Sequence, residues 1–162
     1  MYEIGDYLVY LKDVCKIVDI KEKFLKNEDY YTLIPVNDNS LKLNVPINNK
    51  DIRNLITLSE VNQLIDNILF IEPIYIDDKL LEQEYKKLIN SKNHSDLIKI
   101  IKTTYLRNKN RIDNKKKVSD KDKTYFELAE KYLYTELGIV LNKSFEETKE
   151  YIIKKVLEGK NE

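Results

Sequence analysis

The sequence predicts an α+β fold in two domains, a small β-barrel followed by a compact, all-α helical domain. Three observations support this. Short stretches that alternate between apolar and polar residues end near Asn49. From Thr57 onward the pattern is that of capped helices. Glu72-Pro73 then interrupts the chain. We therefore expect domains at residues 1–70, with a linking helix at about 57–68, and at residues 74–162.

Four or five short strands are expected in the N-terminal part. Polar segments at 26–29 and 37–40 are rich in residues that favour turns, and Pro35 and Pro46 suit strand ends or edges. So few short strands must curl to bury one face and cover their edges, which favours a barrel of SH3 or Tudor type. The expected strands are residues 7–10, 14–25, 30–36 and 41–45, with one more short strand within 52–56.

Capping residues indicate where the helices of the C-terminal part begin. Thr57 with Glu60, and Ser144 with Glu147, match the capping box, and Ser119 is a favourable N-cap. Asp77 and the segment 93–96 start two further helices. Helical spacing then predicts inward-facing side chains at Leu81, Tyr85, Leu88 and Ile89, and on the next helix at Leu97, Ile98, Ile101 and Tyr105.

Charge is unevenly distributed along a chain whose formal net charge is zero. Residues 1–75 carry 8 Lys and Arg against 12 Asp and Glu, whereas residues 76–162 carry 20 against 16 and the segment 99–123 carries 10 against 3. This asymmetry indicates a C-terminal part that faces nucleic acid. A solvated helix face without any partner would give the same pattern.

The basic residues are densest in the segment 107–118, where we expect a helix end and a loop before the Ser119 helix. Free N–H groups at a helix start favour phosphate, but Asp120 and Asp122 in the first turn would repel it. The loop cations are therefore the preferred contacts, with sequence-tolerant and salt-dependent affinity. They are Arg107, Lys109, Arg111, Lys115, Lys116 and Lys117.

No pattern of catalytic or metal-binding residues is present in the sequence. His94 is the only histidine and lies in a polar stretch, where we expect a surface cap. Cys15 is the only cysteine and lies in an apolar run, so we expect a buried strand residue and no disulfide. No phosphate-binding or dinucleotide-binding glycine motif occurs among only three glycines. We expect no enzymatic activity, no cofactor and no metal.

No signal-peptide pattern and no apolar run of membrane-spanning length occurs in the sequence. We therefore expect a cytoplasmic protein that makes no membrane contact.

Several segments, taken in order, resemble the CarD/CdnL family of bacterial transcription regulators. The N-terminal segments are Tyr2-Glu3-Ile4-Gly5-Asp6-Tyr7-Leu8-Val9-Tyr10, Val14-Cys15-Lys16-Ile17, Tyr30-Tyr31-Thr32-Leu33-Ile34-Pro35-Val36 and Val45-Pro46-Ile47-Asn48-Asn49. The C-terminal segments are Tyr85-Lys86-Lys87-Leu88, Lys117-Val118-Ser119-Asp120-Lys121-Asp122-Lys123, Ala129-Glu130 and Leu133-Tyr134-Thr135-Glu136-Leu137.

The resemblance implies a Tudor-like N-terminal domain that binds the RNA polymerase β subunit. It also implies a helical domain that binds promoter DNA non-specifically, through the backbone and the minor groove. Such proteins modulate the stability of the open promoter complex. We accordingly expect a nucleoid-associated monomer.

The resemblance also assigns roles to individual residues. Polymerase contacts fall at Lys23 and Leu25, and at Asn44, where the family has an arginine. Leu81 stands where the family has a tryptophan that wedges into DNA, although its helical phase equally predicts a core residue. Lys86 matches a DNA-contact position, and Lys87 and Lys123 are further candidates for DNA contact.

The sequence departs from the family pattern in two places. Leu11-Lys12-Asp13 replaces the usual Pro and Gly after the first strand, and the Gly expected after Asn49 is missing. These departures indicate a diverged paralogue. Two other hypotheses stay open: a nucleic-acid-binding module, architectural or RNA-binding, that does not bind polymerase, and a purely structural interaction protein.

Overall fold

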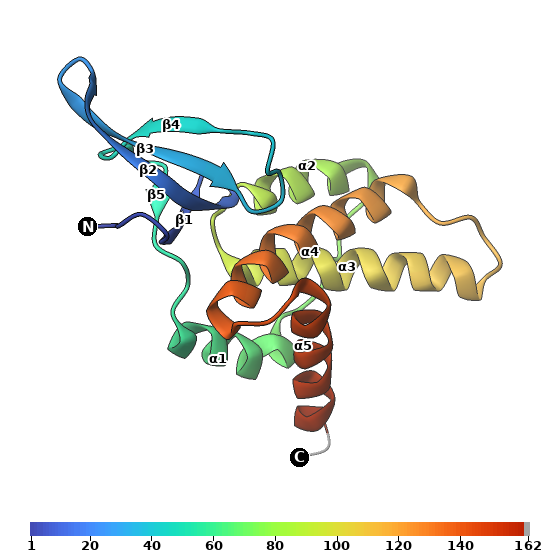
Figure 1. Ribbon diagram of the computed structural model, residues 1–162. Coiled ribbons are helices and arrows are strands. Elements are labelled where there is room, and N and C mark those ends of the chain that lie inside the picture. Colours follow the sequence, from blue (N-terminus) through green and yellow to red (C-terminus); the bar gives the residue numbers. More distant parts are fainter. Residues whose placement is uncertain (161–162) are drawn as a thin grey trace. The chain divides into compact units, whose positions relative to one another are not determined.

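The computed structural model describes residues 1–160 and has an α+β fold, in which an antiparallel sheet is followed by helices (Figure 1). The chain divides into two compact units between Ile56 and Thr57. This boundary is earlier than the expected ones at 70 and 74, because the first helix packs on later helices through Val61, Leu64 and Ile65. The helix at 57–68 therefore belongs to the helical unit.

The N-terminal unit is a five-stranded sheet in which every pair of neighbours is antiparallel. The strand order is β4-β3-β2-β1-β5. Two register shifts bend β2, one between Ile17 and Asp19 and one between Lys21 and Leu25. The strands are β1 (Tyr7–Tyr10), β2 (Asp13–Leu25), β3 (Glu28–Pro35), β4 (Leu43–Pro46) and β5 (Ile52–Arg53).

One face of this sheet forms a hydrophobic core. Cross-strand neighbours supply it in rows, for example Leu8 opposite Cys15 and Ile17 opposite Leu33. The prediction that Cys15 is a buried strand residue is confirmed, and burial raises the pKa of its thiol to about 11. A thiol with so high a pKa is a poor nucleophile at neutral pH.

The sheet is open in the described residues, since β4 and β5 form its two edges, and the expected closed barrel is not confirmed. The fourth strand begins at Leu43 rather than at residue 41. The reason is a tight turn in which Asp38 accepts hydrogen bonds from the Ser40 amide and hydroxyl, and from the Leu41 amide. The fifth strand has only two residues.

The predicted caps of the helical unit are largely confirmed. Both reciprocal bonds of a capping box form between Thr57 and Glu60, and again between Ser144 and Glu147. The Asp77 side chain makes no capping bond. The helical elements are α1 (Leu58–Asn67), η1 (Ile68–Phe70), α2 (Asp78–Ile89), α3 (His94–Asp113), α4 (Asp120–Leu141) and α5 (Phe145–Lys160).

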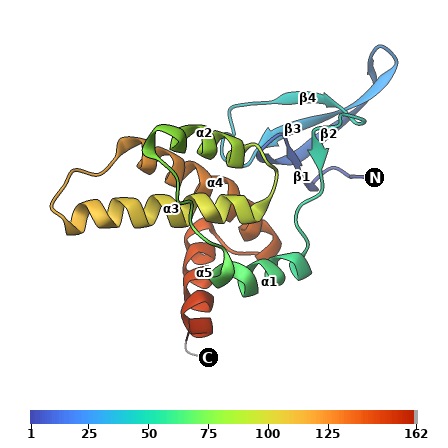
Figure 2. The same ribbon diagram turned by 180° about the vertical axis from the view of Figure 1, so that it is seen from behind.

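Helices α3 and α4 form the centre of this unit (Figures 1 and 2). Helix α2 covers one side, where Leu81, Tyr85 and Ile100 are fully or almost fully buried. Helices α1 and α5 pack against each other and against α4 on the other side. No helix in residues 1–160 combines the length and the hydropathy needed to cross a membrane.

The close contact between α4 and α5 depends on Gly138. A Cβ atom there would lie 2.8 Å from the carbonyl oxygen of Lys143 and 2.9 Å from the hydroxyl oxygen of Thr148, which is fully buried. We expect Gly138→Ala to lower the free energy of unfolding by about 1–3 kcal/mol, although alanine favours helix more than glycine does. Urea unfolding measures this, with exposed Glu127→Ala as the control, and an unchanged or raised stability would contradict the packing described.

Candidate nucleic-acid interface

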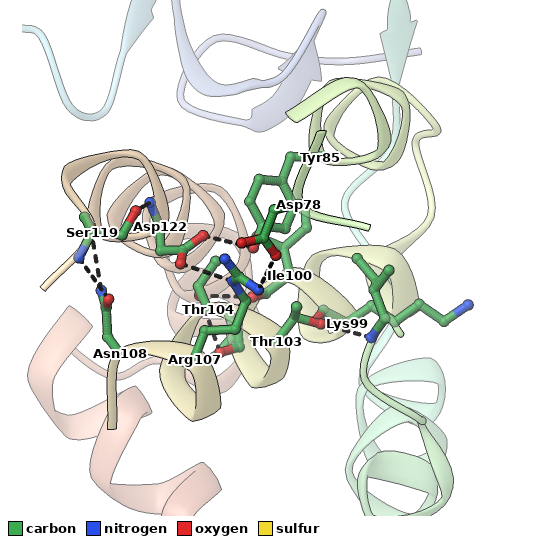
Figure 3. A network of polar contacts seen from close by, with 12 residues as sticks. Asp78, Tyr85, Lys99, Ile100, Thr103, Thr104, Arg107, Asn108, Ser119 and Asp122 are labelled. Carbon is green, nitrogen blue, oxygen red and sulfur yellow. Dashed lines mark hydrogen bonds and ion pairs between the residues drawn. The ribbon is translucent and has the colours of Figure 1, made fainter. Parts of the chain in front are cut away.

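The connection between α3 and α4 is held at its start by the Asn114 side chain, which donates to the Asn110 carbonyl at 2.8 Å, and at its end by Asn108 and Ser119. Asn108 accepts from the Ser119 amide at 2.9 Å, and its own amide group donates to the Ser119 carbonyl at 3.4 Å (Figure 3). The Ser119 hydroxyl in turn accepts from the backbone N–H of Asp122. Hydrogen bonds therefore hold the short segment 114–119 at both of its ends.

Beside this connection, Arg107 joins two carboxylates from different helices (Figure 3). Its Nε donates to Asp122 at 2.9 Å, and its terminal nitrogen donates to Asp78 at 3.0 Å. The other carboxylate oxygen of Asp122 accepts from the Tyr85 hydroxyl at 2.8 Å. Asp122 is fully buried, and each of its carboxylate oxygens accepts a hydrogen bond from within the protein, as buried polar groups usually do.

These contacts shift the pKa values of the residues at both ends of the network. Burial, followed by the hydrogen bond to Asp122, raises the pKa of the Tyr85 hydroxyl, which keeps it a neutral donor. The hydrogen bond from Arg107 holds the pKa of Asp78 below its usual range. Tyr85 therefore stays neutral and Asp78 stays ionised around neutral pH.

The expected DNA-binding role of Arg107 is not supported by this geometry. Its side chain is only 24% exposed and its charge is matched by Asp78 and Asp122. It also lies within α3, which continues to Asp113, rather than in a loop. The same pairing neutralises Asp122, so that residue does not repel a phosphate near the start of α4.

A cluster of cations remains around the α3–α4 connection, and we call it the basic turn. Within residues 109–123 the unburied carboxylates are Asp113 and Asp120, and the exposed Asp78 of α2 lies near Arg111 and Lys121. The α3 helix ends here because Lys115 adopts a left-handed conformation and the Lys116 amide bonds back to the Arg111 carbonyl. Arg111 and Lys121 are half-buried and the others are exposed: the basic turn consists of Lys109, Arg111, Lys115, Lys116, Lys117, Lys121 and Lys123.

Six of these seven residues were expected from the sequence, and Lys121 was missed. The excess of basic residues over 99–123 was the sequence signal that could have identified Lys121. The remaining candidates, Lys86 and Lys87, are exposed on α2, where Lys86 pairs with Glu82 at 3.9 Å. Because they lie about two helical turns beyond Asp78, they extend the candidate interface along α2.

The expectation that Leu81 is an apolar wedge is wrong for this structure. Its side chain is 1% exposed and packs in the core with Tyr85 and Ile100. The helical phase that placed Leu81 inward was therefore the correct interpretation. Its neighbour Leu80 is 53% exposed and is the surface leucine of this helix turn.

Two further expectations about single residues need correction. His94 is not a surface cap: its ring lies 2.9 Å from the Glu136 carboxylate, which is almost fully buried, while Asn93 caps the helix. Tyr105 does not face the core and is 56% exposed.

The expected polymerase contacts all lie in the N-terminal sheet, but they do not form one cluster. Lys23 and Leu25 are exposed near the tip of the β2–β3 hairpin, where Asp29 accepts from the Lys23 amide at 3.0 Å. Asn44 lies on β4 opposite Thr32, whose hydroxyl donates to it at 2.9 Å. Lys23 is four residues along β2 from the level of Asn44, roughly 13 Å by strand rise.

The hairpin tip carries an apolar group that the sequence did not single out. Phe24 is 41% exposed, its ring stacks edge-on against Tyr30 at 5.4 Å, and the Lys21 ammonium lies 4.6 Å from the ring centroid. Phe24 falls within the expected strand 14–25, but the sequence did not indicate that the hairpin would leave its ring exposed.

No known protein-family model matches the chain, and a search of curated proteins finds no significantly similar sequence.

Proposed function

We propose that this protein is a DNA-binding transcription regulator of the CarD/CdnL type. The basic turn is the observation that carries the proposal. Seven cations gather around one short connection, whereas the nearest buried acid, Asp122, is already neutralised by Arg107. This arrangement leaves an excess of positive charge on a backbone with fixed ends, which suits a phosphate backbone.

The proposed mode of DNA binding is electrostatic and sequence-tolerant. Lysines predominate in the basic turn, and lysine binds phosphate as a point charge rather than as a planar fork. The burial of Leu81 favours backbone contact over a wedge at that position. Such binding is weak by itself at physiological salt, so the protein needs a second contact to be placed at a promoter.

We propose that the N-terminal unit, as a Tudor-like module, supplies this contact by binding the RNA polymerase β subunit. Support comes from the sequence resemblance and from the exposed hairpin tip with Lys23, Phe24 and Leu25. Aromatic residues are enriched at the centres of protein interfaces, whereas charged side chains belong to their polar rims. Tethering to polymerase would raise the effective concentration of DNA at the basic turn, and the open promoter complex would change in stability.

A second function, nucleic-acid binding without polymerase, is favoured by one specific observation. Asn44 replaces the arginine that the family uses at this position, and its oxygen is committed to the Thr32 hydroxyl. At this position the chain therefore has a hydrogen bond inside the sheet and no cation that could bind polymerase. Under this alternative, the basic turn would bind DNA or RNA, and the hairpin tip would have another role.

Lys23→Glu distinguishes these two functions. We expect the full-length variant to lose most of its retention by an immobilised polymerase β subunit, because the substitution reverses the charge at the hairpin tip. Exposed Lys12→Glu, in the β1–β2 turn, is the matched control and should be retained like the wild type. Absence of retention for the wild-type protein itself would remove the polymerase part of the proposal and favour the alternative.

A further inference from the structure

A cleft of about 490 Å³ lies in the helical unit between the segment 73–77 and helix α3. Arg107, from the polar network of Figure 3, forms part of its wall. Leu81 and Thr103 also line the cleft and are almost fully buried. The volume falls within the range of pockets that hold small organic groups.

An exposed tyrosine belongs to this cleft. Tyr75 is 80% exposed, and neither its ring nor its hydroxyl has a partner among the described residues. The backbone beside it is held, because the Ile74 amide donates to the Thr103 hydroxyl at 2.9 Å and that hydroxyl donates to the Lys99 carbonyl at 2.7 Å. The chain thus presents an aromatic ring that is available for stacking.

Two polar side chains of the cleft also have groups that no described residue bonds. The Asp77 side chain makes neither a capping bond nor an ion pair. Asn110 accepts from the Asn114 side chain at 3.0 Å through its oxygen, which leaves its NH₂ group as a donor. An acceptor, a donor and an aromatic face are the features that recognise a nucleobase. A phosphate fits this cleft less well, since the Asp77 carboxylate would repel it.

The basic turn lies next to this cleft. Asn110 is within one helical turn of the end of α3, where the basic turn's connection begins. Arg107 binds Asp78 at 3.0 Å, and Arg111 and Lys121 of the basic turn lie near the same carboxylate. Cations suited to a phosphate backbone therefore adjoin a cleft suited to a base.

We propose that the cleft binds an unpaired base of single-stranded DNA whose phosphates contact the basic turn. The base stacks on Tyr75, and its edge bonds to Asp77 and Asn110. Duplex DNA does not supply this contact, because its bases are stacked on one another and their pairing edges are occupied. The inference rests on the proposed DNA binding and adds to it a preference for unpaired strands.

The preference is measured on the full-length protein by fluorescence anisotropy. The probe is a labelled DNA strand of about 16 nucleotides, used alone and annealed to its complement. We expect the strand to bind more tightly than the duplex. Tyr75→Ala should weaken binding of the strand about fivefold or more, because stacking on the ring is lost, and should leave duplex binding nearly unchanged.

Two further variants control for the chemistry and the position of the ring. Tyr75→Phe keeps the aromatic face and should bind the strand nearly as tightly as the wild type. Tyr105→Ala removes another exposed tyrosine, which follows Thr104 on α3 and does not line the cleft. This variant should bind both probes like the wild type.

A direct readout of stacking is possible because the chain has no tryptophan. Tyr75→Trp places a single indole at the cleft, and a base that stacks on it should quench its emission. We expect quenching by the single strand and little quenching by the duplex. Tyr105→Trp, outside the cleft, should be quenched by neither.

Two results would overturn the proposal. One is a Tyr75→Ala variant that binds the strand like the wild type, or that loses strand and duplex binding equally. The other is tighter binding of an RNA strand of the same sequence, which would make RNA the occupant.

Reversing Lys115, Lys116 and Lys117 to glutamate together separates this inference from the proposed function. Loss of strand and duplex binding in that variant, with no effect of Tyr75→Ala, would remove the cleft and leave the basic turn as the interface. Unchanged binding of both probes by the charge-reversed variant would contradict the proposed function itself.

Discussion

Replacing Arg107 with alanine is expected to lower the free energy of unfolding by about 3 kcal/mol. Removing one partner of a buried ion pair leaves the other charge without compensation, which costs about 3–5 kcal/mol, and the partial exposure of Arg107 places this case at the lower end. Asp122 would remain fully buried with only the Tyr85 hydroxyl as its side-chain partner. The melting temperature should fall by roughly 10 °C or more, as measured by circular dichroism.

Lys109→Ala is the matched control, because it removes a cation from the same helix at an exposed position and should cost less than about 0.5 kcal/mol. Tyr85→Phe should cost about 1–3 kcal/mol by leaving one oxygen of Asp122 unsatisfied. Since both side chains bind the same carboxylate, the double variant should deviate from additivity. A loss below about 1 kcal/mol for Arg107→Ala would mean that the network does not stabilise the fold.

Reversing the charge of Lys115, Lys116 and Lys117 together is expected to weaken binding of the full chain to duplex DNA by about two orders of magnitude at low salt. This estimate takes about 1 kcal/mol for each exposed phosphate contact. The slope of log K against log salt should also become shallower by about 3, because three counterions fewer are released. Fluorescence anisotropy between about 50 mM and about 200 mM salt measures both quantities.

The control carries the same number of charge reversals outside the basic turn, at the exposed Lys12, Lys50 and Lys154. Both variants then have the same net charge, so any difference between them comes from position. Equal losses of affinity would show that net charge alone governs binding. Retention of wild-type affinity by the Lys115, Lys116 and Lys117 variant would exclude the basic turn as the interface.

Local sequence signals predicted local structure well in this chain. The capping boxes at Thr57 and Ser144 are confirmed, because an N-cap and its partner three residues later interact within one helix turn. The buried position of Cys15 is also confirmed, because a short continuous run of apolar residues is typical of a strand that is covered on both faces. The exposed lysines of the basic turn also follow from composition alone.

What the sequence could not predict depends on contacts between distant residues. Arg107 looked like one more loop cation until its pairing with Asp122, fifteen residues away, and with Asp78, twenty-nine residues away, was known. Closure of the sheet depends on whether its edge strands meet, which strand patterns do not specify. At Leu81, helical phase and family resemblance gave opposite predictions, and packing against Ile100 supports the first.

The lifetime of the open promoter complex tests the central claim most directly. It is measured on one promoter template with polymerase from the same organism, in the presence of the wild-type protein, the Lys23→Glu variant, or the variant with Lys115, Lys116 and Lys117 reversed. The proposed function predicts that the wild type changes the lifetime and that both variants lose most of this effect, since both contacts are needed. An unchanged lifetime with the wild type, or an equal effect of all three proteins, would contradict it.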